Sequence, residues 1–501
     1  MFLYNINRIL LKKRTRKNKI SSACKILNGL RLRKDMVITM YEIDFHHPVP
    51  VYFIGIGGSN MSGLAELLHS RGFLVSGSDK NHSPVCDRLE DMGISIFYSQ
   101  EAAHILPEFA FVVYTAAIRK DNPEFAAAEK LGIPLLSRAE FLGQLMRQYK
   151  DAIGVAGTHG KTTTSSMLSM IFLEAGLDPT ISLGAVLEPI GSSSRVGHSD
   201  HFIVESCEYT NSFLHFYPRH EIILNIEAEH LDFFKDIEAI RKSFRLFMEK
   251  LDVGGHLVIQ GDIEGLDVLT KGLDASITTY GLEGSRKTYD YTAANITYDE
   301  NDFGSYDLMR GNTCIAHISL HVVGAHNISN SVAAAAMADL LGVPVSAIIS
   351  ALHHFGGAKR RFEKKGVVNG VTVVDDYAHH PSEIHATLTA AKHYPHRELW
   401  CVFQPHTYSR TKLFFDDFIR VLSLADKIVL ADIYASREKD PGDISSRDLA
   451  EKLKSAGKDV YYFPTFEEIQ KFLLSNCKHG DLLITMGAGD IVNVGEAILK
   501  Y

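Results

Sequence analysis

Short apolar runs alternate with amphipathic stretches along the chain from about residue 47 to its end. This alternation is typical of βα units that build parallel sheets. It predicts helices over residues 64–70, 123–130, 163–174 and 328–341. It predicts strands over residues 51–56, 73–75, 111–114, 151–156, 201–204, 221–224, 371–374, 399–403, 428–431 and 482–485. Between 254 and 322 the pattern changes to short alternating runs with turn residues, which predicts an antiparallel insertion.

Size and composition favour an ordinary globular protein of several domains. A chain of 501 residues is too long for one hydrophobic core, and 46% hydrophobic with 22% charged residues is an average composition. We predict three domains, over residues 47–150, 151–358 and 359–501. No apolar run approaches the length of a membrane span, so we expect no stable membrane association. The six cysteines lack paired spacing, which favours a reducing, cytoplasmic location.

Charge is unevenly distributed. Residues 1–39 hold eleven Lys/Arg against one acid, Asp35, whereas the whole chain has a net charge of −8. The rest of the chain is therefore acidic, which argues against a nucleic-acid partner. We expect residues 1–46 to be a basic extension that is disordered or not translated, with translation starting at Met40. A presequence-like arm and an RNA-binding tail are the alternatives.

A phosphate-binding loop is the strongest motif in the sequence. An apolar run from Asp151 leads into Gly157-Thr158-His159-Gly160-Lys161-Thr162-Thr163, where a helical pattern begins. Backbone N–H groups and the helix dipole favour phosphate, the lysine reaches the outer phosphates and a hydroxyl holds Mg²⁺. Val155 stands where the strict pattern has its first glycine. The alternative is an ordinary βα turn, which Lys161-Thr162 at the helix start disfavours, so we predict ATP binding.

A second glycine cluster follows the first predicted strand. Gly57, Gly58 and Ser59 resemble a dinucleotide fingerprint with the acidic Asp79 at a suitable distance. Asn60 replaces the third glycine, although the loop can still hold a diphosphate against a helix N-terminus. NAD, FAD, a nucleotide sugar and simple tight packing remain open at this point.

Acidic residues follow two predicted strands of the central domain. Glu205 directly follows one strand and suits Mg²⁺ beside a γ-phosphate, although a strand-end acid that faces solvent is the alternative. The segment Asn225–Asp232 holds three acids and His230 beyond the next strand. Such density favours a bound cation, because the acids otherwise repel one another. On spacing alone, a metal-binding His230 and a structural one are equally favoured.

The remaining candidates lie near the start of the alanine-rich helix and in the third domain. Asn327 and Asn330 suit both edges of adenine, although a helix cap is locally the better interpretation. In the third domain, polar side chains that suit phosphate and carboxylate recognition precede or follow predicted strands. They are Arg361, Asp375, Asp376, His379, His406 and Arg410.

Taken in order, these segments resemble the Mur ligases, in the branch that adds L-alanine. The resemblance covers about residue 41 to the end. It departs from the family pattern at Asn60 and Thr407. It is carried by Gly55–Glu66, Gly157–Thr163, Asn225–Asp232, His326–Asn330, Arg360–Phe362, Asp376–Glu383, Phe403–Thr411 and Met486–Asp490.

The resemblance implies the fold and the reaction. It implies an α/β protein with a Rossmann-like UDP-sugar domain, a central P-loop ATPase-type domain with a mainly parallel sheet, and a Rossmann-like amino-acid domain. The implied enzyme is an ATP-dependent amide ligase of peptidoglycan precursor synthesis. It joins L-alanine to the carboxylate of UDP-N-acetylmuramate through an acyl phosphate. We expect ATP, two Mg²⁺ ions, small-molecule substrates only, and a monomer or homodimer.

The resemblance also implies a role for each candidate residue. Lys161, His230, Arg361 and His379 would be catalytic, and Thr162, Glu205 and His230 would hold metal. Gly57, Gly58, Ser59 and Asp79 would bind the UDP-sugar, and His379, His406 and Arg410 would bind the amino acid and acyl phosphate. ATP would contact residues 157–163, Asn327, Asn330, Arg361 and Asp376, with Asp375 or Asp376 near the ribose. Because the groups come from three domains, the site would be complete only after domain closure.

Three rival functions remain. A sister ligase that attaches a ready-made tripeptide to the same sugar ranks behind, because its first glycine loop differs. An NAD-dependent dehydrogenase would leave Lys161, Glu205 and His230 without a task. A non-catalytic nucleotide-sugar sensor is disfavoured because these same residues are intact.

Overall fold

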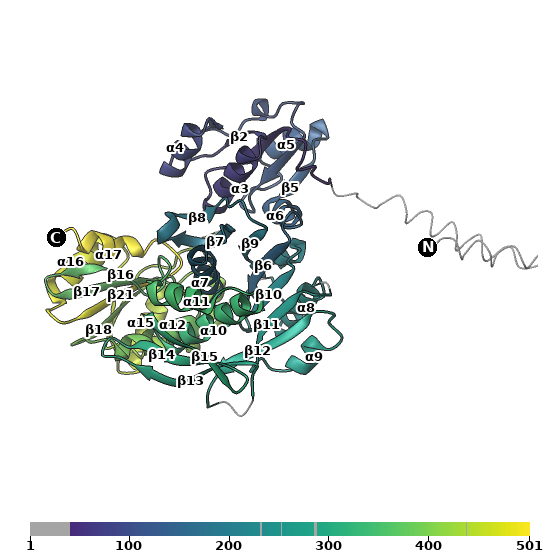
Figure 1. The fold of residues 1–501 in the computed structure, drawn as a ribbon. Helices are drawn as coiled ribbons and strands as arrows, with labels where there is room; N and C mark the ends of the chain where they lie inside the picture. Colours follow the sequence, from purple (N-terminus) through teal and green to yellow (C-terminus); the bar gives the residue numbers. More distant parts are fainter. Residues whose placement is uncertain (1–40, 231–232, 252, 285–287, 437) are drawn as a thin grey trace, which may run out of the picture. The chain divides into compact units, whose positions relative to one another are not determined.

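The computed structural model describes residues 41–501 except 231–232, 252, 285–287 and 437. The predicted extension, residues 1–46, therefore lies almost wholly outside the described residues. Within them the strands form three sheets, which lie inside the three ranges predicted for the domains (Figure 1).

The first sheet has five parallel strands in the order β3-β2-β1-β4-β5. Its strands are β1 (Pro50–Ile54), β2 (Leu74–Ser78), β3 (Ser95–Phe97), β4 (Phe111–Tyr114) and β5 (Leu135–Ser137). Its helices are α3 (Ser59–Ser70), α4 (Pro84–Asp91), η2 (Ala102–His104), α5 (Pro123–Leu131) and α6 (Arg138–Met146). This is the Rossmann-like arrangement that the sequence predicts.

The second sheet has ten strands in the order β15-β14-β13-β12-β11-β10-β6-β9-β7-β8. Its strands are β6 (Asp151–Ala156), β7 (Thr180–Leu187), β8 (Ser192–Arg195), β9 (His201–Glu205), β10 (His220–Ile223), β11 (His256–Gln260), β12 (Ser276–Leu282), β13 (Tyr291–Tyr298), β14 (Phe303–Arg310) and β15 (Thr313–Val323). Its helices are α7 (Lys161–Glu174), η3 (Glu188–Ile190), η4 (Tyr209–His215), α8 (Ile237–Met248), α9 (Leu266–Thr270), α10 (Ala325–Leu340) and α11 (Val345–His354).

The predicted antiparallel insertion over 254–322 is only partly correct. Strands β11, β12 and β13 pair in parallel and extend the main sheet, and only β13, β14 and β15 pair antiparallel. The alternating runs and turn residues do not distinguish the two cases, because half-buried parallel and antiparallel strands share the same two-residue period.

Helices α7, α10 and α11 pack together beside the central sheet (Figure 1). The alanine run of α10, Ala333–Ala336, is fully buried in this core. Small side chains let α10 lie close to α7, and this places the first turn of α10 next to the phosphate loop. The core is therefore part of what positions the site.

The third sheet has the order β16-β17-β21-β18-β19-β20, and only β16 is antiparallel to its neighbour. Its strands are β16 (Glu363–Val368), β17 (Val371–Asp376), β18 (Leu399–Phe403), β19 (Lys427–Leu430), β20 (Asp459–Tyr462) and β21 (Leu482–Met486). Its helices are α12 (Pro381–His393), α13 (Tyr408–Leu413), α14 (Phe415–Leu422), α15 (Ser446–Ser455), α16 (Phe466–Asn476) and α17 (Val492–Ile498).

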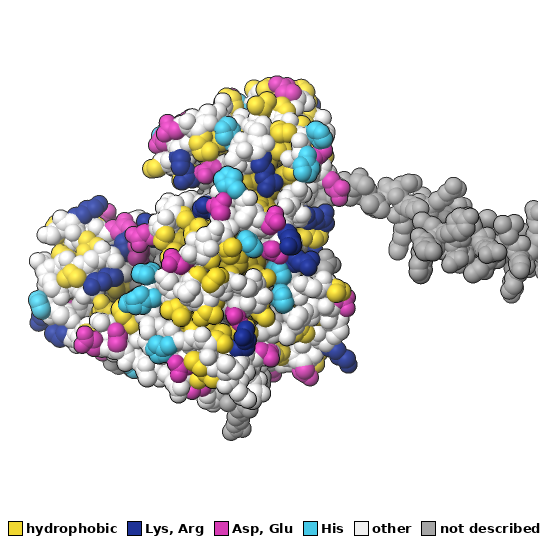
Figure 2. Space-filling view, in the orientation of Figure 1, with side chains coloured by type: hydrophobic (Ala, Val, Ile, Leu, Met, Phe, Trp, Pro, Cys, Tyr) yellow, Lys and Arg dark blue, Asp and Glu magenta, His cyan; other side chains and the backbone are white. Residues whose placement is uncertain are grey.

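Acidic and basic side chains are interspersed on the face shown in Figure 2, and over the residues described there no continuous basic patch is visible. None of the described helices has the length and apolar character needed to cross a bilayer.

A buried carboxyl in the central sheet gives a first testable prediction. Glu221 on β10 is fully buried, neither of its carboxyl oxygens has a hydrogen-bond partner within the described chain, and burial raises its pKa well above the usual value. We expect Glu221→Met to stabilise the protein at neutral pH by about 1–3 kcal/mol, the cost of an unpaired buried polar group.

The sign of the pH effect follows from the raised pKa. The unfolded carboxyl ionises above about pH 4.3, whereas the folded one stays protonated, so the wild type loses stability as pH rises from there toward the folded pKa. The variant has no such loss. The difference in unfolding free energy between the variant and the wild type, measured by urea denaturation, should therefore increase from about pH 4 to 8. The exposed Glu451→Met is the control. An unchanged difference in unfolding free energy across this pH range would contradict the prediction.

Candidate active site

The phosphate loop joins β6 to α7. Gly157 has φ +148° and Gly160 has φ +83°, backbone conformations that favour glycine, and α7 begins at the next residue, Lys161. A side chain at position 160 is also excluded by contact, because its Cβ would lie 2.6 Å from Oδ1 of Asn330. Both glycines are therefore required for the backbone to turn tightly into the helix N-terminus, where phosphate groups bind.

Asn225, two residues after the end of β10, supports this loop. Its Oδ1 accepts the amide of His159 at 2.8 Å, and its Nδ2 donates to the carbonyl of His159 at 3.1 Å. Two residues on, the amide of Glu227 donates to the Thr158 hydroxyl at 2.9 Å. The polar residue predicted at this strand end is thus a direct neighbour of the loop.

Lys161 is largely covered and paired with an acid. Its Nζ contacts Glu208 Oε2 at 3.0 Å and donates to the carbonyl of Thr158 at 2.9 Å. Burial opposes the charged form, but Glu208 outweighs it and raises the pKa of Lys161. The lysine therefore carries a fixed positive charge at the start of α7.

The three residues predicted as metal ligands lie around this lysine. Thr162 is buried in the first turn of α7. Glu205 ends β9 beside the loop strand β6, its Oε2 accepts the amide of Gly184 at 2.8 Å, and its charge acts on Lys161. His230 has φ +55°, and its Nε2 lies 3.6 Å from Glu208 Oε1, which is buried without a hydrogen-bond partner in the described chain.

A cavity of about 230 Å³ opens beside the loop, between the central and C-terminal domains. It is lined by Asn327 and Asn330 from α10 and by Arg361 and Asp376 from the C-terminal domain. The asparagines are not helix caps, since α10 begins at Ala325 and no side chain caps it. The locally favoured cap interpretation is therefore wrong. Asn327 Nδ2 donates to the carbonyl of Val323 at 2.8 Å and Asn330 Nδ2 donates to Asn327 Oδ1 at 3.3 Å, so both side chains are held in the cavity wall.

The structure gives the two candidate aspartates of β17 different surroundings. Asp375 is fully buried, pairs with Arg360 at 2.9 Å and accepts the Thr485 hydroxyl at 2.7 Å. Asp376 lines the cavity, and burial raises its pKa to about 6 although Arg361 acts in the opposite direction. Of the two, Asp376 is the one placed to contact a ligand there.

The predicted amino-acid residues form a cluster with an acid from the central domain. Arg410 Nη1 lies 3.0 Å from His406 Nδ1, and the rings of His379 and His406 are 5.7 Å apart. Arg410 Nη2 also donates to Glu229 Oε1 at 2.9 Å. Burial lowers the pKa of His379 to about 4 and of His406 to about 3, so both imidazoles are neutral at physiological pH.

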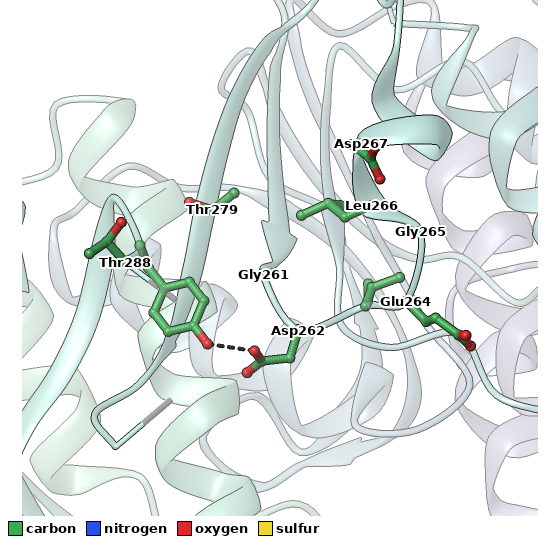
Figure 3. Close-up of a pocket in the computed structure, with 10 residues that line it drawn as sticks. Gly261, Asp262, Glu264, Gly265, Leu266, Asp267, Thr279 and Thr288 are labelled. Carbon is green, nitrogen blue, oxygen red and sulfur yellow. Dashed lines mark hydrogen bonds between the residues drawn. The ribbon is translucent and has the colours of Figure 1, made fainter. Parts of the chain in front are cut away.

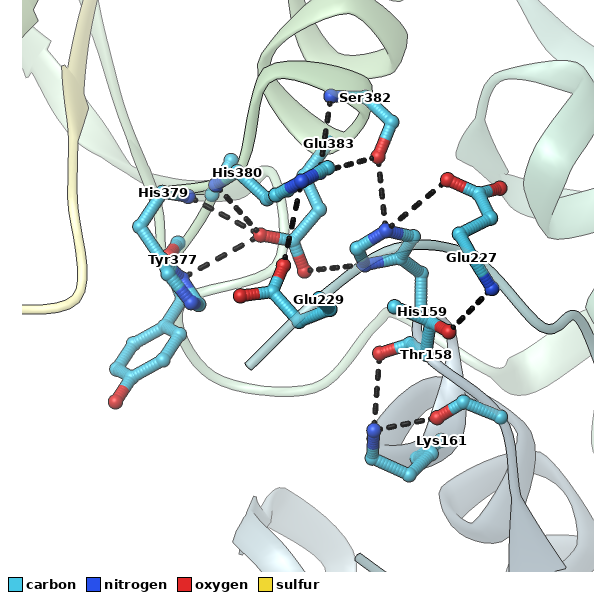
Figure 4. Close-up of polar contacts among 12 residues, drawn as sticks. Thr158, His159, Lys161, Glu227, Glu229, Tyr377, His379, His380, Ser382 and Glu383 are labelled. Atoms are coloured by element: carbon cyan, nitrogen blue, oxygen red, sulfur yellow. Dashed lines mark hydrogen bonds and ion pairs between the residues drawn. The ribbon is translucent and has the colours of Figure 1, made fainter. Parts of the chain in front are cut away.

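A polar network connects the phosphate loop to the start of α12 (Figure 4). His159 Nε2 is 2.8 Å from the Ser382 hydroxyl, and His159 Nδ1 is 3.3 Å from Glu383 Oε1. Burial favours the neutral ring, but Glu227 and Glu383 outweigh it and raise the pKa of His159 to about 9. Charged contacts thus hold the two domains together at this point.

The first glycine loop lies in the N-terminal domain, where α3 begins at Ser59 with Gly58 as its cap. Asp79 supports this loop from within, because its Oδ2 accepts the Gly57 amide at 3.0 Å. A side chain at Gly57 would have its Cβ 2.7 Å from Cys86 Sγ. The spacing of Asp79 is thus explained by its hydrogen bond to the loop itself.

A second, more open cavity of about 600 Å³ lies beside β11 and β12, where Tyr289 donates to Asp262 at 2.6 Å (Figure 3). None of the predicted site residues lines it.

Several site residues are absent from the sequence prediction. Glu208 pairs with Lys161, Glu229 pairs with Arg410, and Glu383 pairs with His159. Glu229 and Glu383 lie inside motifs of the Mur ligase resemblance, and Glu208 follows the candidate Glu205 by three residues, so the available signal was an acid close to a predicted site residue. Their partners lie 47 to 224 positions away in the chain, a distance over which spacing carries no information.

Three family models match the chain, one in each of the three predicted domain ranges. The model described as Mur ligase family, catalytic domain, matches residues 50–150. The Mur ligase middle domain matches residues 155–338, and the Mur ligase glutamate ligase domain matches residues 360–489.

Curated relatives match nearly the whole chain. The UDP-N-acetylmuramate–L-alanine ligase of Lachnoclostridium phytofermentans is 57% identical over 468 residues, which are 92% of this chain and 100% of that protein. The enzyme of the same name from Agathobacter rectalis is 55% identical, with the same two shares.

Solved structures agree with these matches. The UDP-N-acetylmuramate–alanine ligase of Thermotoga maritima has a TM-score of 0.75 and 28% identity, and covers 90% of this chain and 98% of its own. A murein peptide ligase from Psychrobacter arcticus has a TM-score of 0.67 and 26% identity, with the same coverage. With three domain models in chain order and full-length relatives at this level of identity, the chain belongs to the Mur ligase family.

Proposed function

We propose that this protein joins L-alanine to the carboxylate of UDP-N-acetylmuramate, with conversion of ATP to ADP and phosphate. The single observation that carries the proposal is the meeting of the two domains at this place, where His159 of the phosphate loop contacts Ser382 and Glu383 while Glu229 pairs with Arg410 of the His379, His406 and Arg410 cluster. An ATP-binding loop that lies beside an amino-acid cluster suits a reaction in which phosphate activates one substrate for attack by another.

The first chemical step makes a carboxylate reactive. A carboxylate oxygen of the sugar attacks the γ-phosphorus of ATP, the bond to the β–γ bridging oxygen breaks, and ADP leaves. Positioning and neutralisation of charge are the main contributions of the protein to such transfers. We assign these to Lys161 at the start of α7 and to Arg361, which lines the cavity from the other domain.

ATP is held by both domains in this proposal. The triphosphate lies on residues 157–163, and the adenosine occupies the cavity with Asn327, Asn330 and Asp376. The asparagine amides offer donor and acceptor atoms to adenine, and Asp376 suits the ribose hydroxyls. The UDP diphosphate is held separately, by Gly57, Gly58 and Ser59 at the N-terminus of α3.

The residues around Lys161 fit a divalent cation. Glu208 Oε1 is buried without a hydrogen-bond partner in the described chain and faces His230, and Glu205 ends the neighbouring strand. We propose that Thr162 and Glu205 hold one Mg²⁺ and that His230 helps to hold a second. Bound there, Mg²⁺ neutralises charge on the phosphates.

The second chemical step forms the amide. The amine of L-alanine attacks the acyl-phosphate carbonyl, and phosphate leaves from the tetrahedral intermediate. His379 Nδ1 lies 3.0 Å from the carbonyl of Tyr377, which fixes the ring proton there and leaves Nε2 free to accept from the amine. Arg410 suits the carboxylate of the amino acid, because its guanidinium can bind it with two hydrogen bonds.

The test is release of phosphate from ATP with UDP-N-acetylmuramate and one amine substrate at a time. We expect release with L-alanine and formation of the amide product. L-serine and glycine should react more slowly, by a factor set by about 1–3 kcal/mol in the pocket. Preference for the tripeptide substrate of the sister ligase, or no release with any amine, would contradict the proposal.

A further inference from the structure

A group of buried ligand atoms lies between the central and C-terminal domains. His159, Glu229 and His380 each place one metal-binding atom within 4.8 Å of the others. They come from the phosphate loop, from the segment after β10 and from the residue before α12, and Figure 4 shows them side by side. Three segments that are far apart in the sequence thus lie next to one another here.

Each member of this group leaves one buried atom without a hydrogen-bond partner in the described chain. These atoms are His159 Nδ1, Glu229 Oε2 and His380 Nε2. Glu229 is 5% exposed and His380 is 6% exposed, so solvent does not readily satisfy them. Their nearest polar contacts are ion-pair distances, 3.3 Å from His159 Nδ1 to Glu383 Oε1 and 3.5 Å from His380 Nε2 to Glu229 Oε2. Buried polar atoms normally make a hydrogen bond, and a cation among these three would complete their bonding.

The other polar atoms of Glu229 and His380 are already used to hold the side chains in position. Glu229 Oε1 accepts from Arg410 at 2.9 Å, and His380 Nδ1 lies 2.8 Å from the Ser382 hydroxyl. A histidine that binds a metal through one nitrogen is usually oriented in this way by a hydrogen bond at the other.

The ligand types decide between metals. Two imidazoles and one carboxylate form a set that binds zinc, whereas Mg²⁺ prefers oxygen ligands throughout. Ligand atoms around a tetrahedral zinc ion are about 3.3 Å apart, given bonds of about 2.0–2.1 Å. His380 Nε2 and Glu229 Oε2 are already 3.5 Å apart.

We propose that His159, Glu229 and His380 form a binding site for zinc or a similar transition-metal ion that joins the C-terminal domain to the phosphate loop. The site is separate from the proposed Mg²⁺ ligands Thr162, Glu205 and His230. A bound ion would connect His380, before α12, to His159 and Glu229 of the central domain. Occupancy should therefore stabilise the contact between the two domains.

The experiment is a calorimetric titration of the full-length protein with Zn²⁺ in the presence of millimolar Mg²⁺. The pH is held at about 8, since zinc displaces a proton from imidazole. We expect one zinc ion per chain, a higher melting temperature, and with Co²⁺ a visible absorption band. Glu229→Gln and His380→Gln should each weaken zinc binding at least about tenfold. Glu229→Gln keeps the side-chain shape, so it remains informative if His380→Gln folds poorly.

Two control variants locate the binding. The described chain has one other group of suitable ligands, the exposed His82, Asp87 and Glu90, and His82→Gln should bind zinc like the wild type. His230→Gln should also keep its zinc. Zinc binding that survives both Glu229→Gln and His380→Gln, or that is lost in either control, would overturn the proposal. So would absence of binding in the wild type.

Discussion

Replacement of Lys161 by methionine is expected to lower kcat at least about a hundredfold, the effect of removing a preorganised charge from a transition state. Methionine keeps much of the side-chain length and removes the ammonium that starts α7. Phosphate release under saturating substrates measures the effect. Turnover close to that of the wild type would mean that another group stabilises the transferring phosphate.

A structural effect of the Lys161 change must be separated from the catalytic one. The change leaves Glu208 buried without its 3.0 Å partner, so some loss of stability is expected as well. Melting curves measured alongside the kinetics show whether the variant is folded at the assay temperature. Lys454→Met, an exposed position on α15, is the control and should change neither quantity.

Replacement of Arg410 by methionine is the second change with a large expected effect. Glu229 would remain a buried carboxylate without its guanidinium, and breaking such a pair costs about 3–5 kcal/mol. We expect kcat/KM for L-alanine to fall at least about a hundredfold, on this scale, with a smaller change in KM for ATP. Arg420→Met, which breaks an exposed pair with Asp417 on α14, should have little effect.

The pH dependence of the Arg410 variant has a definite sign. Burial would raise the pKa of Glu229, but Arg410 and the neighbouring histidines outweigh it and lower it to about 2. A depressed carboxyl pKa stabilises the fold above the unfolded value of about 4.3, and this stability is lost as pH falls toward 2. Without Arg410 the loss should begin at higher pH. Identical acid-unfolding curves for the variant and the wild type would contradict this.

The order of elements and the phosphate loop could be predicted from sequence, because both are local. Apolar runs predict strands such as β4 and β18 at their observed bounds, and Gly160-Lys161 marks the start of α7. The parallel pairing of β11, β12 and β13 could not, because periodicity does not tell which strand lies alongside.

The charged partners of the site were also beyond sequence reasoning. Glu208 and Glu383 act through contacts with Lys161 and His159 that only the fold creates. The choice between Asp375 and Asp376 is of the same kind, because both lie at the end of one strand and only their contacts and burial distinguish them. Local chemistry predicts which residue types belong in a site, and tertiary structure decides which of them meet.

The 230 Å³ cavity has walls from two domains, with Asn330 on one side and Arg361 on the other. A small inhibitor that fills it would contact Arg361 and Asp376 as well as the phosphate-loop domain, so its binding would depend on both domains. If the two walls separated, its measured affinity would be proportional to the fraction of molecules in which they are together. Changes far from the cavity that shift the balance between domain arrangements could therefore cause drug resistance without altering any residue that the compound touches.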